Sequence, residues 1–213
     1  MIKGITLYHY WRSSASWRVR WGLEIKGVSH EKVPVNILGA EEKLPGYMAK
    51  NPSGYLPCLV MEGHPPLGES IAILEWLEET FPRPSFFSGD AFRRALIRQL
   101  AETLNSGTQP IQNLDVARRH SDDKEEQARW MHHWMVRGLG VFETLLKSAG
   151  DGHKFCVSDE PTLADICLIP QIYAAHRVKV DMDQFPRCRD IYAHALTLPS
   201  CIASHPDRFA PPA

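Results

Sequence analysis

The sequence contains no apolar run that approaches the roughly 20 residues required to cross a bilayer, so it predicts no membrane-spanning helix. Its formal net charge is only -1 at pH 7, from 24 basic and 25 acidic side chains, so no overall field draws it to nucleic acid or an anionic membrane. Tandem repeats and low-complexity tracts are absent too. The chain of 213 residues is therefore expected to be globular, with one or two domains.

A disulfide framework and a metal-binding pattern are also missing. The 5 cysteines make an odd number and include no CxxC pair, which indicates reduced thiols in a cytoplasmic protein. No cysteine–histidine spacing suggests zinc, and the adjacent His132 and His133 would point about 100° apart on a helix, so we expect no metal site. The Arg- and Ser-rich start resembles an organellar transit peptide, but a strand pattern begins at Ile2 and cleavage would remove it.

The first 80 residues alternate between strand and helix patterns. The expected elements are a strand Ile2–Tyr10, a helix Ala15–Lys26, a strand His30–Pro34, a helical stretch Glu41–Ala49, two short strands Pro57–Met61 and His64–Pro66, and a helix Glu69–Thr80. Strand-helix-strand followed by strand-strand-helix is the thioredoxin-like order. Pro82 and Pro84 then break any helix, so we expect a domain boundary there, with the first domain at residues 1–82.

The remainder, residues 88–213, is predicted to be an all-helical domain. Helices are expected near 90–118, 122–148, 162–176 and 186–197, with a short turn near 200. Thr162 and Asp165 have the form of a capping box at the start of the third of these, directly after Pro161. The predicted fold class is thus α/β plus all-α.

The segment Ser13–Arg20 carries the strongest functional signal. It places three serines and two arginines, with Arg12 before them, where the first strand turns into the first helix, and no acidic residue precedes Glu24. A helix N-terminus has unpaired amide donors and a partial positive charge, and serine hydroxyls add further donors. One serine would indicate only a helix cap. The cluster predicts an anion-binding site.

Seven of the eight residues of this segment match the Ser-Ser-Cys-Ser-Trp-Arg-Val-Arg pattern of the zeta-class glutathione transferases, the family of maleylacetoacetate isomerase, with Ala15 in place of the cysteine. Tyr10-Trp11-Arg12-Ser13 also resembles the opening of bacterial maleylpyruvate isomerases. The resemblance covers residues 2–205 and implies a thioredoxin-like domain, a helical domain, glutathione as cofactor and a homodimer. By this resemblance Ser13 matches the family's catalytic serine, which stabilises the thiolate of glutathione. Ser14 is the alternative.

Two further segments of the first domain resemble the family. Leu56-Pro57 matches a segment whose proline is cis and whose preceding backbone pairs with glutathione, although an ordinary trans proline opening a strand is the commoner case. Ser70 at a helix start can hydrogen-bond a carboxylate and Glu69 can pair with an ammonium, which together suit the γ-glutamyl group. Zeta enzymes usually have Gln-Ser here, and Glu-Ser is common in other transferase classes. Ser70 also nearly fits a nucleophile elbow, but the further parallel strands that such a hydrolase needs are missing.

In the second domain, Thr108–Leu114 resembles a family segment in the long first helix. Pro110 is expected to kink that helix and turn Gln109, Gln112 and Asn113 toward glutathione or the product, whereas the plain alternative is a polar helix face. Asp115 departs from the arginine that maleylpyruvate isomerases carry near this point.

Arg177 matches an arginine thought to hold the distal carboxylate of a dicarboxylic substrate, and its plain alternative is a surface arginine near a helix end.

The resemblance implies a glutathione-dependent cis–trans isomerase of maleyl dicarboxylic acids, acting by thiolate addition, rotation and elimination. Its catalytic residues would be Ser13, Ser14, Arg12 and Arg177. Its cofactor contacts would be Ser13, Ser14, Ala15, Ser16, Trp17, Arg18, Leu56, Pro57, Glu69, Ser70, Gln109, Gln112 and Asn113. The alternatives are a transferase that conjugates or dehalogenates, and a glutathione-binding scaffold without activity.

Overall fold

The computed structural model describes residues 4–150 and 152–212, and these residues form two compact units. The first unit takes in residues up to Ser85 and again from Pro199 onward, and the second is Phe86–Leu198. The change of unit after Ser85 lies close to the expected boundary. The return of the chain to the first unit at Pro199 differs from the expectation, which put every residue after 88 in the helical domain.

The first unit is built on a small mixed sheet. Among the described residues its strands are β1 (Thr6–His9), β2 (Glu31–Pro34) and β3 (Cys58–Val60), in the order β2-β1-β3. The central β1 runs parallel to β2 and antiparallel to β3. Along β1 the side chains alternate between half-buried and buried, because successive residues of a strand face opposite sides of the sheet.

The strands of the first unit differ from the expectation after β3. The segment His64–Pro66 does not form a strand, and only a single bridge between Leu59 and Leu67 is present there. Proline cannot donate to a strand ladder, and Pro65 and Pro66 are both exposed in this segment. The expected first strand began at Ile2, and its residues Ile2 and Lys3 lie outside the described part of the chain.

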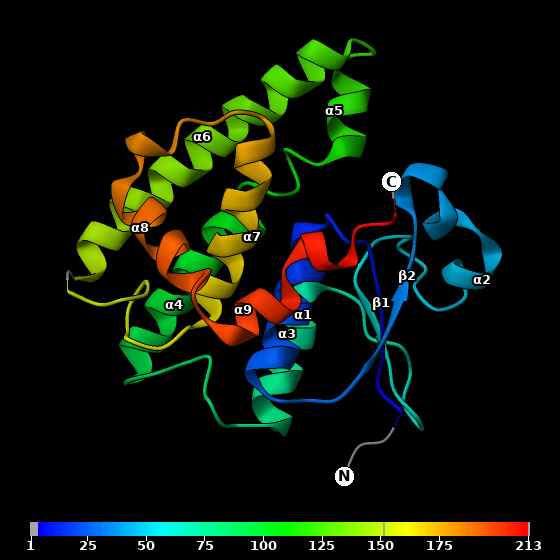
Figure 1. Ribbon diagram of the computed structural model, residues 1–213, viewed down its shortest axis with the longest axis horizontal. Helices are drawn as coiled ribbons and strands as arrows, with labels where there is room; N and C mark the ends of the chain where they lie inside the picture. Colours follow the sequence, from blue (N-terminus) through cyan, green and yellow to red (C-terminus); the bar gives the residue numbers. More distant parts are fainter. Residues whose placement is uncertain (1–3, 151, 213) are drawn as a thin grey trace. The chain divides into compact units, whose positions relative to one another are not determined.

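The helices of the first unit lie on two sides of this sheet (Figure 1). They are α1 (Ser14–Ile25), η1 (Ile37–Gly39), η2 (Glu41–Lys43), α2 (Pro45–Met48), α3 (Ser70–Thr80), α9 (Pro199–Ser204) and η4 (Pro206–Phe209). α1 and α3 pack against each other.

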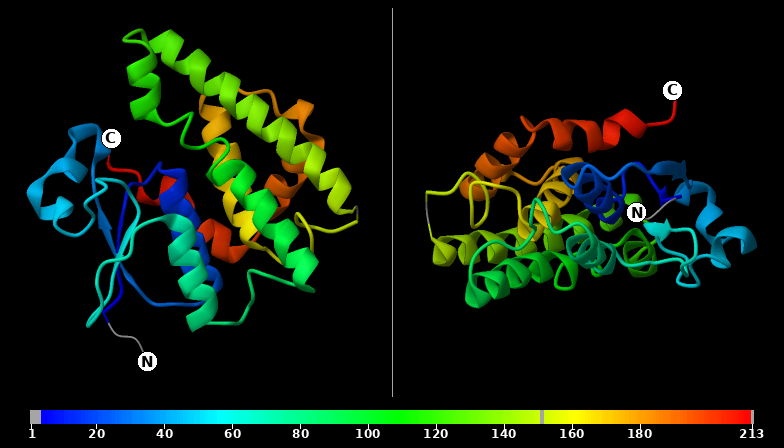
Figure 2. Two further views of the ribbon diagram at one scale, coloured as in Figure 1. Left: turned by 180° about the vertical axis from the view of Figure 1, so that it is seen from behind. Right: turned by 90° about the horizontal axis from the view of Figure 1, so that it is seen from below.

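The C-terminal segment, residues 199–212, packs on α1 (Figures 1 and 2). The indole nitrogens of Trp17 and Trp21 donate hydrogen bonds to the hydroxyls of Ser204 (3.0 Å) and Ser200 (3.1 Å). Both indoles are fully buried. Because a buried indole N–H needs a partner, the two serines of α9 supply acceptors that these indoles require.

The second unit is helical. Its elements are α4 (Ala91–Asn105), α5 (Leu114–His120), α6 (Lys124–Ala149), α7 (Leu163–Arg177), η3 (Met182–Gln184) and α8 (Pro186–Ala195). α4 packs on α6 and α7, and α5 lies along the first half of α6 (Figure 1). Searched over the described residues, no helix is both long and apolar enough to cross a bilayer.

The expected helix 90–118 is wrong, because α4 ends at Asn105 and α5 begins only at Leu114. Pro110 therefore lies in the turn between two helices and does not kink one. Thr108 is the anchor of this turn, since its hydroxyl donates to the Thr103 carbonyl (2.9 Å). A Cβ on Gly138 of α6 would come within 2.2 Å of the Thr108 hydroxyl, so only glycine allows this close approach.

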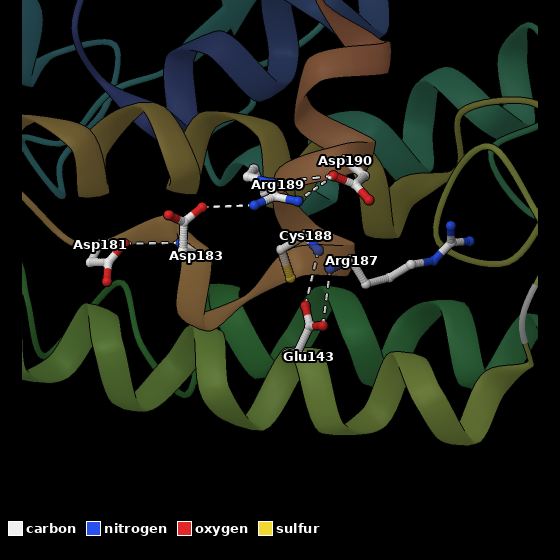
Figure 3. Close-up of polar contacts among 7 residues, drawn as sticks. All are labelled: Glu143, Asp181, Asp183, Arg187, Cys188, Arg189 and Asp190. Atoms are coloured by element: carbon white, nitrogen blue, oxygen red, sulfur yellow. Dashed lines mark hydrogen bonds and ion pairs between the residues drawn. The ribbon is translucent and has the colours of Figure 1, made fainter.

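Two buried carboxylates cap helices of the second unit. Asp165 accepts from the backbone nitrogen of Thr162 (2.8 Å), which confirms the predicted capping box of α7, and also from that of Cys156 (2.8 Å). Glu143 projects from α6 to the first turn of α8, where it accepts from the backbone nitrogens of Arg187 (3.1 Å) and Cys188 (2.9 Å) (Figure 3). Asp165 thereby joins the start of α7 to the loop just before it, and Glu143 joins α6 to α8, 44 positions along the chain.

Candidate functional site

The candidate site begins where β1 ends and α1 starts. Ser13 is the N-cap of α1, and its hydroxyl oxygen accepts from the backbone nitrogen of Ser16 (3.2 Å). A serine hydroxyl has one hydrogen to donate as well as lone pairs that accept. Since the cap uses a lone pair, the Ser13 hydrogen can still be donated to an anion. A hydroxyl that accepts a hydrogen bond becomes a better donor, and the α1 dipole favours negative charge at this position.

The next residues of the motif turn into the interior. Ser16, Trp17 and Arg18 have no exposed surface, and their predicted contact with the cofactor stays a prediction. The Ser16 hydroxyl instead accepts from the backbone nitrogen of Tyr10 (3.3 Å), which fixes the end of β1 against α1. Ser13, Ser14 and Ala15 are half-buried and remain candidate contacts.

The peptide bond between Leu56 and Pro57 is cis, as the sequence predicts. The Tyr55 carbonyl just before it accepts from the Asn51 amide nitrogen (2.8 Å) and the Tyr47 hydroxyl (2.5 Å). Tyr8 of β1 pairs with Cys58 of β3. The antiparallel register therefore brings the Leu56–Pro57 peptide to the end of β1, where the Ser13 turn (residues 10–13) starts.

The start of α3 forms the second anion-binding element. Glu69 is exposed and has a positive φ of 60° with ψ 114°, a conformation that is unfavourable for a residue with a Cβ. The turn sends its carboxylate outward while Ser70 begins the helix. Arg18 donates to the Ser70 hydroxyl oxygen (3.3 Å), which leaves the hydroxyl hydrogen for a ligand.

The same hydrogen bond locates the two helix starts relative to each other. Arg18 lies four residues after Ser14, or about 6 Å along the helix axis at 1.5 Å per residue. The first residue of α3 is therefore hydrogen-bonded to the second turn of α1. The structure brings the Ser13 turn, the Leu56–Pro57 peptide and Ser70 to one end of the sheet.

Arg12 precedes this cluster in the turn. It is half-buried, donates from Nη2 to the Tyr10 hydroxyl (3.3 Å), and lies over the Trp11 ring at 4.7 Å. Its buried Nε has no hydrogen-bond partner among the described residues. The guanidinium geometry suits a carboxylate, so the half-buried Arg12 stays a candidate for binding an acidic ligand.

In the second unit the predicted amide cluster has different roles. Gln112 and Gln171 form a reciprocal amide pair, with nitrogen-to-oxygen distances of 3.1 Å and 3.3 Å. Gln112 is 6% exposed and Gln171 is fully buried, so the pair has a structural role, and the ligand contact expected of Gln112 stays a prediction. Asn113 caps α5 by accepting from the backbone nitrogen of Asp115 (2.9 Å). Gln109 is half-buried and stays a candidate.

The arginines of the second unit include two that the sequence reasoning missed. Arg118 and Arg119, with Asp115, line an open cavity of about 380 Å³ on α5. Arg118 lies 3.9 Å from the Asp115 carboxylate. The run of two arginines and His120 was a visible signal, but a basic last turn of a helix is also what the helix dipole favours. Arg177, the predicted substrate ligand, is exposed at the last residue of α7.

This donor set can hold a small zwitterionic molecule that also carries an acidic sulfur. Hydroxyls and helix starts at Ser13 and Ser70 suit anions, and Glu69 suits an ammonium group. Among residues 4–150 and 152–212, no three His, Cys, Asp or Glu side chains are grouped so as to hold a metal ion.

Comparison with known proteins agrees with this chemistry. Two family models match the chain: glutathione S-transferase, N-terminal domain, over residues 7–85, and glutathione S-transferase, C-terminal domain, over residues 126–194. Maleylacetoacetate isomerase of Rattus norvegicus is 39% identical over 95% of this chain and 92% of its own length. The isomerase of Pseudomonas aeruginosa is 38% identical over 94% of this chain and 95% of its own length.

Solved structures give the same result. A crystal structure of maleylacetoacetate isomerase from Anaeromyxobacter dehalogenans 2CP-1, with GSH bound in its active site, is 40% identical to this chain. It superposes with a TM-score of 0.87, over 96% of each chain. The chain belongs to the glutathione S-transferase family, in the zeta-class group that contains the maleylacetoacetate isomerases.

Proposed function

We propose that the protein is a glutathione-dependent cis–trans isomerase that converts maleylacetoacetate to fumarylacetoacetate. The observation that carries the proposal is the Ser13 hydroxyl, which caps α1 through its oxygen and keeps a hydrogen to donate. The relatives described above are isomerases of this kind, and the solved relative binds GSH in its active site.

The first unit offers a complementary group for each part of glutathione. The Ser70 hydroxyl, held by Arg18, suits the carboxylate of the γ-glutamyl group, and the exposed Glu69 carboxylate suits its ammonium. The backbone of Leu56, beside the cis peptide, suits the cysteinyl part. These three features support glutathione as the cofactor.

Ser13 stabilises the cofactor sulfur as a thiolate. A free thiol with a pKa near 8.5 is only a few per cent ionised at neutral pH, and lowering that pKa by about two units requires about 2.7 kcal/mol of differential stabilisation. A charge-assisted hydrogen bond from Ser13, together with the α1 dipole, can supply a stabilisation of the thiolate of this order. When bound, glutathione supplies the sulfur nucleophile for addition to the cis double bond and leaves after rotation. Ala15 does not impair this chemistry, since the family cysteine it replaces is not the nucleophile.

Arginines bind the acidic substrate. The half-buried Arg12 is the candidate for one carboxylate, and the exposed Arg177 is the candidate for the distal carboxylate by resemblance to the family. Arg118 and Arg119 are further candidates for binding the substrate carboxylates, because they line the cavity on α5. Guanidinium groups suit carboxylates and also disperse negative charge that develops next to them.

The test is a direct assay with purified protein, glutathione and maleylacetoacetate, in which formation of fumarylacetoacetate is followed. A rate that requires glutathione supports the proposal, and no such rate rejects it. The same preparation is assayed with α-haloacids and aromatic electrophiles. Activity with these alone would identify a conjugating or dehalogenating transferase. Glutathione binding with an unshifted thiol titration would identify a scaffold.

We also propose a cytoplasmic homodimer. The large apolar side chains of Phe92 on α4 and Val141 on α6 are 73% and 43% exposed, which supports a further apolar contact. All 5 cysteines are free thiols, which supports a reducing compartment. Light scattering measures the mass in solution, and fractionation of cells locates the protein.

A further inference from the structure

We propose that Arg20 is a positioning residue for the Ser13 turn, defined as residues 10–13, and that the C-terminal segment 199–212 holds Arg20 in place. The proposal rests on the proposed function, because the turn matters through the hydroxyl of Ser13. In the sequence Arg20 was counted with the anion-binding cluster. In the structure it has no exposed surface and cannot bind a ligand directly.

The guanidinium of Arg20 contacts the backbone of the turn at consecutive residues. Nη2 donates to the Trp11 carbonyl (3.0 Å) and Nη1 to the Tyr10 carbonyl (3.4 Å). The Tyr10 carbonyl also accepts from the backbone nitrogen of Ser13 (3.1 Å). Two adjacent peptide planes are thus fixed, and only Arg12 lies between them and Ser13.

Each residue has only two soft backbone dihedrals, so fixing both carbonyls leaves few ways to reorient Ser13. The hydrogen bonds from Arg20 therefore set the direction of the Ser13 hydroxyl. A displacement of about 1 Å at a reacting group can lower a rate about 100-fold. A small loosening of the turn is consequently expected to affect catalysis more than stability.

Residues far along the chain hold the other side of the same guanidinium. Nε donates to the Ser204 carbonyl of α9 (3.1 Å), and the Phe209 ring lies 4.9 Å from the guanidinium carbon. Nη1 also contacts Nδ1 of His9 (3.0 Å). Arginine presents five donors in a rigid planar fork, whereas lysine is a point charge on a flexible stem and cannot span these acceptors together.

The experiment compares Arg20→Lys and Phe209→Leu with Ser200→Ala as the matched control. Phe209 is half-buried, so its replacement by leucine removes the aromatic face and retains an apolar side chain. Ser200→Ala removes the hydrogen bond from Trp21 and loosens the same α9–α1 contact without touching Arg20. For each variant we measure the thermal midpoint, the affinity for glutathione, kcat, and the pKa of the thiol of bound glutathione by ultraviolet titration.

We expect Arg20→Lys and Phe209→Leu to raise the pKa of the bound thiol and to lower kcat at least fivefold, with glutathione affinity within twofold. Ser200→Ala should lower the thermal midpoint alone. The proposal is overturned if Phe209→Leu and Arg20→Lys lower the thermal midpoint while kcat and the thiol pKa stay at the wild-type values. Should Arg20→Lys fail to fold, Phe209→Leu decides alone.

The thiol titration does not depend on the substrate. If the wild-type protein ionises bound glutathione but isomerises nothing, the proposed function fails while the role of Arg20 is still tested by the shift of the thiol pKa.

Discussion

The side-chain amides of Gln112 and Gln171 donate to each other in both directions inside the second unit. This reciprocal pair satisfies two polar groups that have almost no contact with solvent. It gives a glutamine in a segment that resembles a ligand-binding region of the family a partner inside the second unit.

Replacing Gln112 by leucine should lower the free energy of unfolding by about 1–3 kcal/mol, because the buried Gln171 amide loses its partner. The double variant Gln112→Leu/Gln171→Leu should be close to wild type, since neither polar group then remains unpaired. Urea unfolding of the four proteins of this cycle measures the coupling. Gln109→Ala, at a half-buried position nearby, serves as the control. If Gln112→Leu kept the wild-type stability but bound glutathione more weakly, Gln112 would instead be a ligand contact, as the family resemblance implies.

The two roles of Ser13 can be separated by substitution. Ser13→Ala removes both the cap and the donor, and should lower the isomerase rate at least tenfold. Ser13→Asp keeps an acceptor that caps α1 but offers no hydrogen at neutral pH. We therefore expect Ser13→Asp to keep wild-type stability within about 0.5 kcal/mol and to lose activity as Ser13→Ala does. Wild-type rates in both variants would transfer the role to Ser14, which Ser14→Ala then tests.

The arginines of the second unit should affect substrate binding and not cofactor binding. Arg177→Ala, Arg118→Ala and Arg119→Ala are each expected to raise KM for a maleyl dicarboxylate about fivefold or more, since a charge-assisted hydrogen bond contributes about 1.5–3 kcal/mol. KM for glutathione should stay constant. Arg129→Ala is the control, because this exposed arginine of α6 pairs with Glu126 (2.6 Å). An unchanged KM for the dicarboxylate in all three variants would contradict the assignment.

Acid should destabilise the protein through His9. Burial, and next the charge of Arg20, lower the pKa of His9 from 6.5 to about 3. Between these values the unfolded chain binds a proton that the folded chain does not, so this contribution is complete above pH 6.5 and is lost as the pH falls. The expected slope is about 1.4 kcal/mol per pH unit. Urea unfolding between pH 6.5 and 5 checks it, and His9→Asn, which retains an acceptor for Arg20, should show a smaller slope. Equal slopes for the two proteins would contradict this explanation.

Local patterns in the sequence predict much of the fold. The α1 boundaries lie within one residue of the expectation, because a serine cap and an apolar stripe are local signals. The capping box at Thr162 and the cis Pro57 are confirmed for similar reasons, the latter through the family resemblance. The break between α4 and α5 was missed, since it depends on contact between Thr108 and Gly138, which lie 30 positions apart in the numbering.

The candidate site was predicted less completely than the fold. The motif around Ser13 identifies the right turn, but it cannot tell which side chains face a ligand and which face the interior. Arg18 and Arg20 look equivalent in the sequence. Their separate roles depend on Ser70 and Ser204, whose positions only the folded chain determines.

The C-terminal segment has a consequence for the order of events during biosynthesis. Ser200 and Ser204 provide the acceptors for Trp21 and Trp17, yet the ribosome adds them 179 and 187 residues after these tryptophans. The thioredoxin-like unit therefore cannot complete its interior until α9 has been translated. A part of the chain that is synthesised early is thus completed by a segment that is synthesised much later.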